Sequence, residues 1–242
     1  MTNEEIVCQF IMKGNGFKLK QQLQTPLYLD VANYKYYLKV LQCQFSNVIP
    51  NITENLYVES QLVCGPGVYE LDDLINAYNV YSATYGELTA DFSIGRITLT
   101  NNTGSTLTIT SSNFLTHPAL GVFSLPITLN DGESVKSSKT PVIQDFNFFV
   151  LTSENVVGNT YTQDNDGSFE VSNALWNFSS AFKPFRLKTW TAVQPVAFRM
   201  DQGTLQYMAF ELKDGNGHSL SVVPGAVSDF SVTAQVVKVR KI

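Results

Sequence analysis

The feature that most constrains the fold of this chain is a succession of strand-like segments, each closed by a turn sequence. Asn-Asp-Gly, Asp-Asn-Asp-Gly and Asp-Gly-Asn-Gly turns stand at residues 130–132, 164–167 and 214–217. Between such turns apolar and polar residues alternate, as in residues 17–23 and 230–239. This two-residue period, bounded by Gly, Asn and Asp, is typical of β-strands with one buried face.

Roughly ten such segments follow one another without alternating helices, a pattern that favours a sandwich or barrel over parallel βαβ units. We expect an all-β fold, a single jelly-roll sandwich with short inserted helices. Residues 13–16, Lys-Gly-Asn-Gly, separate an apolar start from the first clear strand. The sequence therefore predicts an N-terminal arm over residues 1–16 and a jelly-roll domain over residues 17–242.

The longest predicted strand covers residues 34–45. Strict alternation places Tyr37, Leu41 and Phe45 on one face, and Leu38 and Val40 on the other. Since both faces are then largely apolar, the pattern indicates a strand buried between two layers.

Helical signals are few. One apolar stripe at helical spacing predicts a helix near residues 71–79, and Asp72 and Asp73 suit its first turn because the helix dipole favours acidic groups there. The stripe consists of Leu71, Leu74, Ile75 and Tyr78. Residues 112–121 predict a short helical turn that ends at Gly121, and residues 91–100 and 105–110 predict a hairpin around Asn-Asn-Thr-Gly.

Composition excludes several classes of protein. Only 15% of the 242 residues are charged, and the formal net charge is −5 without a cluster of Lys or Arg, so we expect no direct nucleic-acid binding. No apolar run approaches the ~18 residues of a membrane-spanning helix. The acidic start lacks the features of a secretory signal. Cys8, Cys43 and Cys64 are odd in number and lack C-x-x-C spacing, which fits a reducing compartment better than disulfides or zinc.

The sequence offers little for catalysis or for metal binding. His117 and His218 both stand in turn-like contexts, and no G-x-S-x-G motif accompanies them. The acidic turn at residues 164–167 resembles a calcium loop, but with Thr162 at the first position the twelfth is Asn173 instead of the bidentate Glu. We therefore expect no catalytic residue, no cofactor and no metal site, and a protein that is not an enzyme.

Aromatic residues are abundant, with 11 Tyr, 16 Phe and 2 Trp. Aromatic β-surfaces bind sugars or bases by stacking, although the alternating positions of these residues favour a role in the core. Asn51, Asn101 and Asn177 match the glycosylation sequon, which we interpret as chance matches because no secretory signal is visible.

Several motifs give the chain a resemblance to a known family. They are Leu29-Asp30, the strand through Phe45, Asn47-Val-Ile-Pro-Asn-Ile52, Glu54-Asn55 and Gly67-Val-Tyr-Glu-Leu-Asp-Asp-Leu74. Residues 109–114 with Leu120-Gly121, residues 207–217 and the closing segment 230–239 continue the pattern. From about residue 28 to the end, the chain resembles penton-type vertex proteins of small double-stranded DNA viruses and elements, namely Polinton- or Maverick-like elements, adintoviruses and virophages.

The resemblance implies a single jelly roll that forms homopentamers at the vertices of an icosahedral capsid, within a lattice of a double jelly-roll major capsid protein. The implied partners are further copies of the chain and the major capsid protein, with an external spike or receptor left open, and the implied location is the virion, assembled inside the host cell. The alternatives that the residues leave open are a receptor- or glycan-binding jelly-roll module of a spike or fibre, and an enzyme on a β-sandwich.

Overall fold

The computed structural model describes residues 4–91, 93–143, 148–158, 160–163, 169–179, 186–223 and 225–241. The chain forms two compact units. The first unit combines Met1–Val48 with Phe146–Ile242, and the second unit, Ile49–Asp145, is inserted between these two parts. The expected organisation, one domain over residues 17–242, therefore needs correction, because a second unit with its own core interrupts that range.

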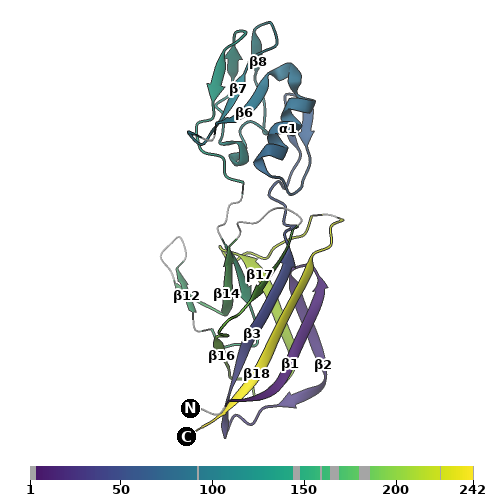
Figure 1. Ribbon diagram of the computed structural model, residues 1–242, viewed down its shortest axis with the longest axis vertical. Helices are drawn as coiled ribbons and strands as arrows, with labels where there is room; N and C mark the ends of the chain where they lie inside the picture. The colour runs from purple at the N-terminus through teal and green to yellow at the C-terminus, as the bar shows by residue number, and fades with distance from the viewer. Residues whose placement is uncertain are drawn as a thin grey trace. The chain divides into compact units, whose positions relative to one another are not determined.

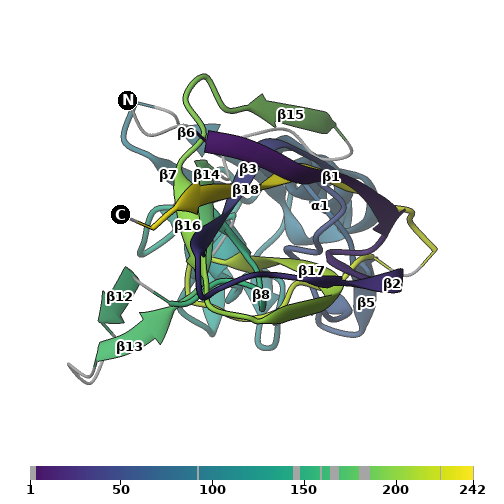
Figure 2. The same ribbon diagram turned by 90° about the horizontal axis from the view of Figure 1, so that it is seen from below.

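The first unit consists mainly of two antiparallel sheets, which Figure 2 shows as two layers. Sheet A has the order β1 (Glu4–Asn15), β18 (Asp229–Arg240), β3 (Tyr34–Ser46) and β15 (Leu187–Thr191), and β16 (Ala197–Met200) also pairs with β3. Sheet B has the order β14 (Ala174–Ser179), β11 (Phe148–Thr152), β17 (Thr204–Asp214) and β2 (Lys18–Tyr28). Strands β12 (Thr160–Gln163) and β13 (Phe169–Ser172) pair with each other as a separate two-stranded sheet.

The order of pairing identifies the sandwich as a jelly roll. If β15 and β16 count as one interrupted strand and the β12–β13 pair is left aside, the described parts of the two sheets contain eight strands in chain order. The first pairs with the eighth, the second with the seventh, the third with the sixth and the fourth with the fifth. This is the pattern of one long antiparallel ribbon rolled into two sheets, so the predicted all-β jelly roll is confirmed.

Aromatic side chains fill the space between the sheets. Phe45 of β3 is fully buried, and its ring centroid lies 6.2 Å from that of Phe17, 5.1 Å from that of Phe149 and 4.8 Å from that of Trp190. Edge-to-face and stacked rings at these distances are favourable arrangements. Much of the aromatic content that the sequence shows therefore serves the core.

The predicted arm, residues 1–16, is corrected by the structure over the range that it describes. Glu4–Asn15 forms β1, which pairs with β18 from Glu4 opposite Val239 to Asn15 opposite Asp229 (Figure 1). Met12 is buried, whereas its neighbour Ile11 is exposed. A bulge between Ile6 and Cys8 interrupts the register. Because this bulge breaks the two-residue period, the sequence pattern of the segment does not predict a strand.

A second bulge corrects the assignment of faces in β3. Thr233 pairs with Gln42, and the next residue of β18, Ala234, pairs with Val40, so Leu41 is an extra residue on β3. Leu38 and Val40 before the bulge, and Phe45 after it, therefore all face the core. The apparent two-sided hydrophobicity of residues 34–45 comes from this shift of register, since an extra residue moves the following side chains to the other face.

The second unit is built from short elements around its own core. Its strands are β4 (Leu56–Val58), β5 (Gln61–Cys64), β6 (Glu87–Asp91), β7 (Arg96–Thr100), β8 (Leu107–Ile109), β9 (Ile127–Leu129) and β10 (Ser134–Lys136). Its helices are α1 (Leu71–Tyr81) and the 3-10 turns η1 (Ala83–Tyr85) and η2 (Pro118–Leu120). The sheets are β10-β7-β6, β4-β5 and β8-β9. Among the described residues of this unit, twenty that are buried, from Ile52 to Leu129, form one hydrophobic cluster.

Helix α1 confirms the helical stripe, and Leu74, Ile75 and Tyr78 are its buried residues. The hydroxyl of Tyr78 donates a hydrogen bond to the carbonyl of Tyr85 at 2.6 Å. Asp73 accepts a hydrogen bond from the amide of Glu70 at 2.8 Å, which supports the start of the helix. The predicted turn that ends at Gly121 is confirmed as η2.

The predicted hairpin between residues 91–100 and 105–110 is wrong. Strand β7 pairs with β6 and β10, whereas β8 pairs with β9. The side-chain amide of Asn101 is buried and donates to the carbonyls of Ser105 and Leu129, at 2.7 and 2.9 Å. This buried amide fixes the loop after β7 in a form that leads the chain to a different partner strand.

Candidate interaction surfaces

The outer face of sheet A is broad and mainly polar, and on it Lys39 pairs with Glu4 and Arg199 pairs with Asp201. The paired strands place four residues in each of four rows across this face, of which only Lys13, Lys39 and Arg199 are charged. From one end of the sheet the rows are Lys13, Ser231, Gln44, Thr189; Ile11, Thr233, Gln42, Thr191; Gln9, Gln235, Lys39, Ala197; and Ile6, Val237, Tyr37, Arg199. Amides and hydroxyls dominate, which suits a wet interface better than an ion-paired one.

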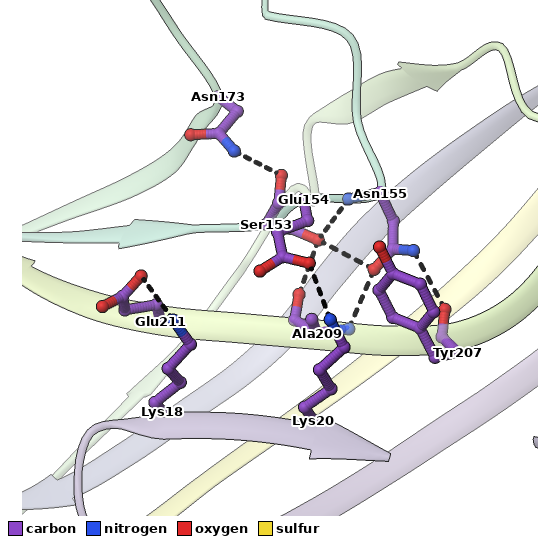
Figure 3. Close-up of polar contacts among 9 residues, drawn as sticks. All are labelled: Lys18, Lys20, Ser153, Glu154, Asn155, Asn173, Tyr207, Ala209 and Glu211. Atoms are coloured by element: carbon purple, nitrogen blue, oxygen red, sulfur yellow. Dashed lines mark hydrogen bonds and ion pairs between the residues drawn. The ribbon is translucent and has the colours of Figure 1, made fainter. Parts of the chain in front are cut away.

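The outer face of sheet B carries ion pairs (Figure 3). The ammonium of Lys20 lies 3.2 Å from Glu154 Oε2 and 4.0 Å from the ring centroid of Tyr207. Lys18 and Glu211 lie 3.7 Å apart. The hydrogen bond from Lys20 holds the pKa of Glu154 below its ordinary value. Exposed ion pairs of this kind are well solvated and contribute little to stability.

The buried side chains of Ser153 and Asn155 have a structural role. Asn155 Oδ1 accepts a hydrogen bond from the amide of Ala209 at 2.8 Å, and its Nδ2 donates to the carbonyl of Tyr207 at 2.9 Å (Figure 3). The hydroxyl of Ser153 donates to the carbonyl of Ala209 at 2.7 Å. Strand β11 ends at Thr152, so these side chains continue its hydrogen bonding along β17. They satisfy buried backbone groups.

A pocket of about 200 Å³ opens at the edge of the sandwich where β14 lies near the segment between β15 and β16. Val40 and Phe198 are buried members of its lining, and Trp176 contributes an aromatic wall from β14. Val193 and Val196 also line it and are 97% and 64% exposed. The sequence pattern does not predict this site, although Pro195 is a signal for it, because proline interrupts a strand or marks a sheet edge.

The second unit also exposes apolar side chains. Val80 and Tyr81, at the end of α1, are 70% and 57% exposed, and Ile94 and Val142 are also exposed. Single exposed apolar residues are common on folded proteins. These residues are therefore weaker indications of a binding surface than the pocket in the first unit.

Both histidines make hydrogen bonds or ion pairs within their own turns. His117 is half-buried, and its Nδ1 accepts a hydrogen bond from the amide of Ala119 at 3.2 Å, which caps η2. His218 is exposed, and its Nδ1 lies 3.1 Å from Asp214 Oδ2 within the turn after β17. These are the turn positions that the sequence indicates.

The cysteines are free, and Cys43 and Cys64 are buried. Burial raises the pKa of Cys64 to about 11 and also raises the pKa values of Cys43 and Cys8. Across the described residues, no three His, Cys, Asp or Glu side chains lie together as a metal site. The acidic turn at residues 164–167 lies outside the described residues. Within the described ranges, no helix is long and apolar enough to cross a membrane.

Two of the sequon asparagines hold backbone groups. Asn51 Nδ2 donates to the carbonyl of Tyr69 at 2.7 Å, and its Oδ1 accepts from the amide of Tyr69 at 2.9 Å. The side chain of Asn101 is fully buried, as described above. Asn177 is exposed on β14. The roles of Asn51 and Asn101 are thus structural.

No protein-family model matches the chain, and no curated protein matches its sequence. Among solved structures, the chain is similar to the crystal structure of the mavirus penton protein. That similarity covers 96% of this chain and 99% of the other, with a TM-score of 0.49 and 8% sequence identity. Mavirus is a virophage, and virophage penton proteins are among those that the sequence resembles.

Proposed function

We propose that this chain is a structural capsid protein, a penton that forms pentamers at icosahedral vertices and contacts the major capsid protein. The observation that carries the proposal is the jelly-roll pairing of the first unit, in which the first strand pairs with the eighth and the fourth with the fifth. Viral capsids are among the structures built from such sandwiches. The motifs in residues 47–74 that resemble penton-type proteins select the vertex role within that class.

The two flanks of the sandwich support assembly into a ring. One flank carries the edge strands β1 and β2, and the other carries β14 with β15 and β16. A closed ring of identical subunits needs two unlike surfaces that fit each other, and the two flanks supply such a pair. The amides and hydroxyls on the outer face of sheet A fit broad, wet contacts.

The proposed location is the virion, after assembly inside the host cell. The proposed partners are further copies of the chain and the major capsid protein, and an external spike or receptor on the vertex is left open. The proposal assigns no catalytic residue, cofactor or metal to the chain, and it involves no direct contact with nucleic acid.

A receptor- or glycan-binding module of a spike or fibre is the second candidate. Trp176 in the wall of the pocket favours it, because sugars stack on aromatic side chains. Tyr28 and Tyr81, which are 79% and 57% exposed, are further aromatic surfaces.

The number of copies in the assembly separates the two candidates. Native mass spectrometry over rising protein concentration should detect a species of about 135 kDa, five times the chain mass of 26.9 kDa. Its population should change little between low and high salt, because the residues that line the pocket on the β14–β16 flank are uncharged. A trimer, or a monomer that binds glycans with an affinity lost in Trp176→Ala, would contradict the vertex function and support the spike or fibre module.

A further inference from the structure

The sixth strand of the jelly roll is broken at the edge of sheet A. Strand β15 pairs with β3 from Leu187 to Thr191, and β16 resumes the pairing at Ala197. The amide of Ala192 still donates to the carbonyl of Leu41 at 2.9 Å. The four residues that follow, 193–196, leave the ladder and contain two exposed valines, Val193 and Val196. The break leaves a recess at this edge of the sheet.

The recess is the pocket described above, and most of its lining is apolar. Its volume of about 200 Å³ is several times the ~30 Å³ that one water molecule occupies in the liquid, so it has room for a branched aliphatic side chain. Val193 is 97% exposed although it lies beside buried apolar residues such as Phe198. An apolar recess with apolar residues exposed at its mouth is a site for an apolar group.

The opposite edge of the same sheet offers such a group. Ile11 lies on the outer face of edge strand β1 and is 63% exposed. Its row across the sheet is Ile11, Thr233, Gln42 and Thr191, and Thr191 lines the pocket. The exposed isoleucine and the pocket therefore lie at the same level along the strands, on opposite edges of sheet A.

If two copies stand side by side with their strands parallel to a common rotation axis, residues at the same position along the strands lie at the same height in both copies. The β1 edge of one copy then meets the β15–β16 edge of the next at the row that contains both features. We propose that Ile11 of one copy enters the pocket between Thr191 and Phe198 of a second copy, and that this contact joins neighbouring subunits. The proposed vertex function enters only through the expected number of copies in the ring.

Disulfide trapping tests this contact directly. The protein carries Ile11→Cys and Val193→Cys in a Cys8→Ser background, which removes the half-buried native thiol. Within one chain the two positions lie three strand spacings apart, which is at least ~14 Å. A disulfide requires Cα atoms within ~7 Å, so any bond that forms joins two copies. Each copy offers two different edges, so mild oxidation should give a ladder of products beyond the dimer.

The matched control replaces Val193→Cys by Val227→Cys. Val227 is 59% exposed, but it precedes β18 and does not line the pocket. We expect a ladder that ends at five chains with the first pair, and at least tenfold less product with the control pair. A first pair that yields no more product than the control overturns the contact, even if native mass spectrometry shows a pentamer. A ladder that ends at three chains would support the proposed contact but contradict the proposed vertex function.

Charge substitutions supply an independent readout. Ile11→Asp should reduce the assembled fraction at least tenfold while the melting temperature of the subunit stays within a few degrees, because the side chain is largely exposed. Val193→Asp should act in the same way, and Val227→Asp should leave assembly unchanged. Equal assembly of all three variants and the parent protein would overturn the proposal.

Discussion

Gly121 shows how one residue without a side chain allows the second unit to close. It ends η2 with a φ of +78°, and a Cβ added there would lie 2.1 Å from the carbonyl oxygen of Lys139. Gly104 has the same φ of +78° but no heavy atom within 4 Å of the corresponding position. The two glycines therefore separate the effect of the backbone conformation from the effect of crowding.

We expect Gly104→Ala to cost roughly 1–2 kcal/mol, which is the penalty of a left-handed conformation for an L-residue. Gly121→Ala should cost roughly 1–3 kcal/mol more, because the backbone around Lys139 must move to make room. Urea unfolding of both variants measures the difference. Equal losses in the free energy of unfolding would show that the close approach of Lys139 to Gly121 does not contribute to the cost of the substitution.

Cys43 gives the stability of the first unit a dependence on pH. Burial raises the pKa of this thiol, whereas in the unfolded chain a thiol has its ordinary pKa near ~8.5. The neutral form is therefore favoured in the folded state, and the associated stability is fully present below ~pH 8.5 and is lost as the pH rises toward the folded pKa.

Between pH 7 and pH 10, under reducing conditions, this one group should lower the free energy of unfolding by about 2 kcal/mol. Cys43→Ala should remove that share of the alkaline loss, whatever its own effect at pH 7. The comparison of the two urea midpoints at each pH checks this expectation. A loss at pH 10 that is as large in Cys43→Ala as in the parent protein would contradict it.

Among the secondary-structure elements, β1 differs most from what the sequence predicts. Phe10 is half-buried and Met12 is 3% exposed, while Ile11 between them is 63% exposed, so the segment has one face in the core. It pairs with β18 along its length. These contacts predict that the first unit needs β1 in order to fold.

Deletion of residues 2–12 should therefore abolish cooperative unfolding of the first unit. Two neighbouring substitutions provide a sharper test: Met12→Asp should cost more than about 3 kcal/mol, because it buries an unpaired charge. Ile11→Asp should stay within about 0.5 kcal/mol in the separated subunit, as surface substitutions do. Thermal melts of both variants measure the two losses of stability. Small losses of similar size in both variants would support the predicted arm over an integral strand.

The elements that the sequence predicts well are those with an unbroken period. The stripe of Leu74, Ile75 and Tyr78 predicts α1, and the alternation in residues 230–239 predicts β18. The misassigned segments contain bulges near Val7 and Leu41, where one extra residue changes the face of all that follow. The site at the break of the sixth strand depends on residues far apart in sequence, such as Trp176 and Val40, so a local pattern does not reveal it.

At the scale of the whole molecule, the jelly roll and the inserted unit contribute in different ways. The first unit has an outer face of sheet A that is rich in amides and hydroxyls, an outer face of sheet B with ion pairs, and two unlike edges. The second unit, residues 49–145, has its own core and interrupts the roll between its third and fourth strands. Surfaces of several kinds on one chain suit a protein whose role is to join unlike neighbours.

The position of this chain in an assembled particle tests the proposed vertex function most directly. The measurement is an icosahedral reconstruction by electron cryomicroscopy of particles that contain the chain and its major capsid protein. The proposed function predicts density for five copies around each five-fold axis, with the β1 edge of one copy against the β15–β16 edge of the next. Density for the chain on three-fold axes, or within the flat facets, would contradict it.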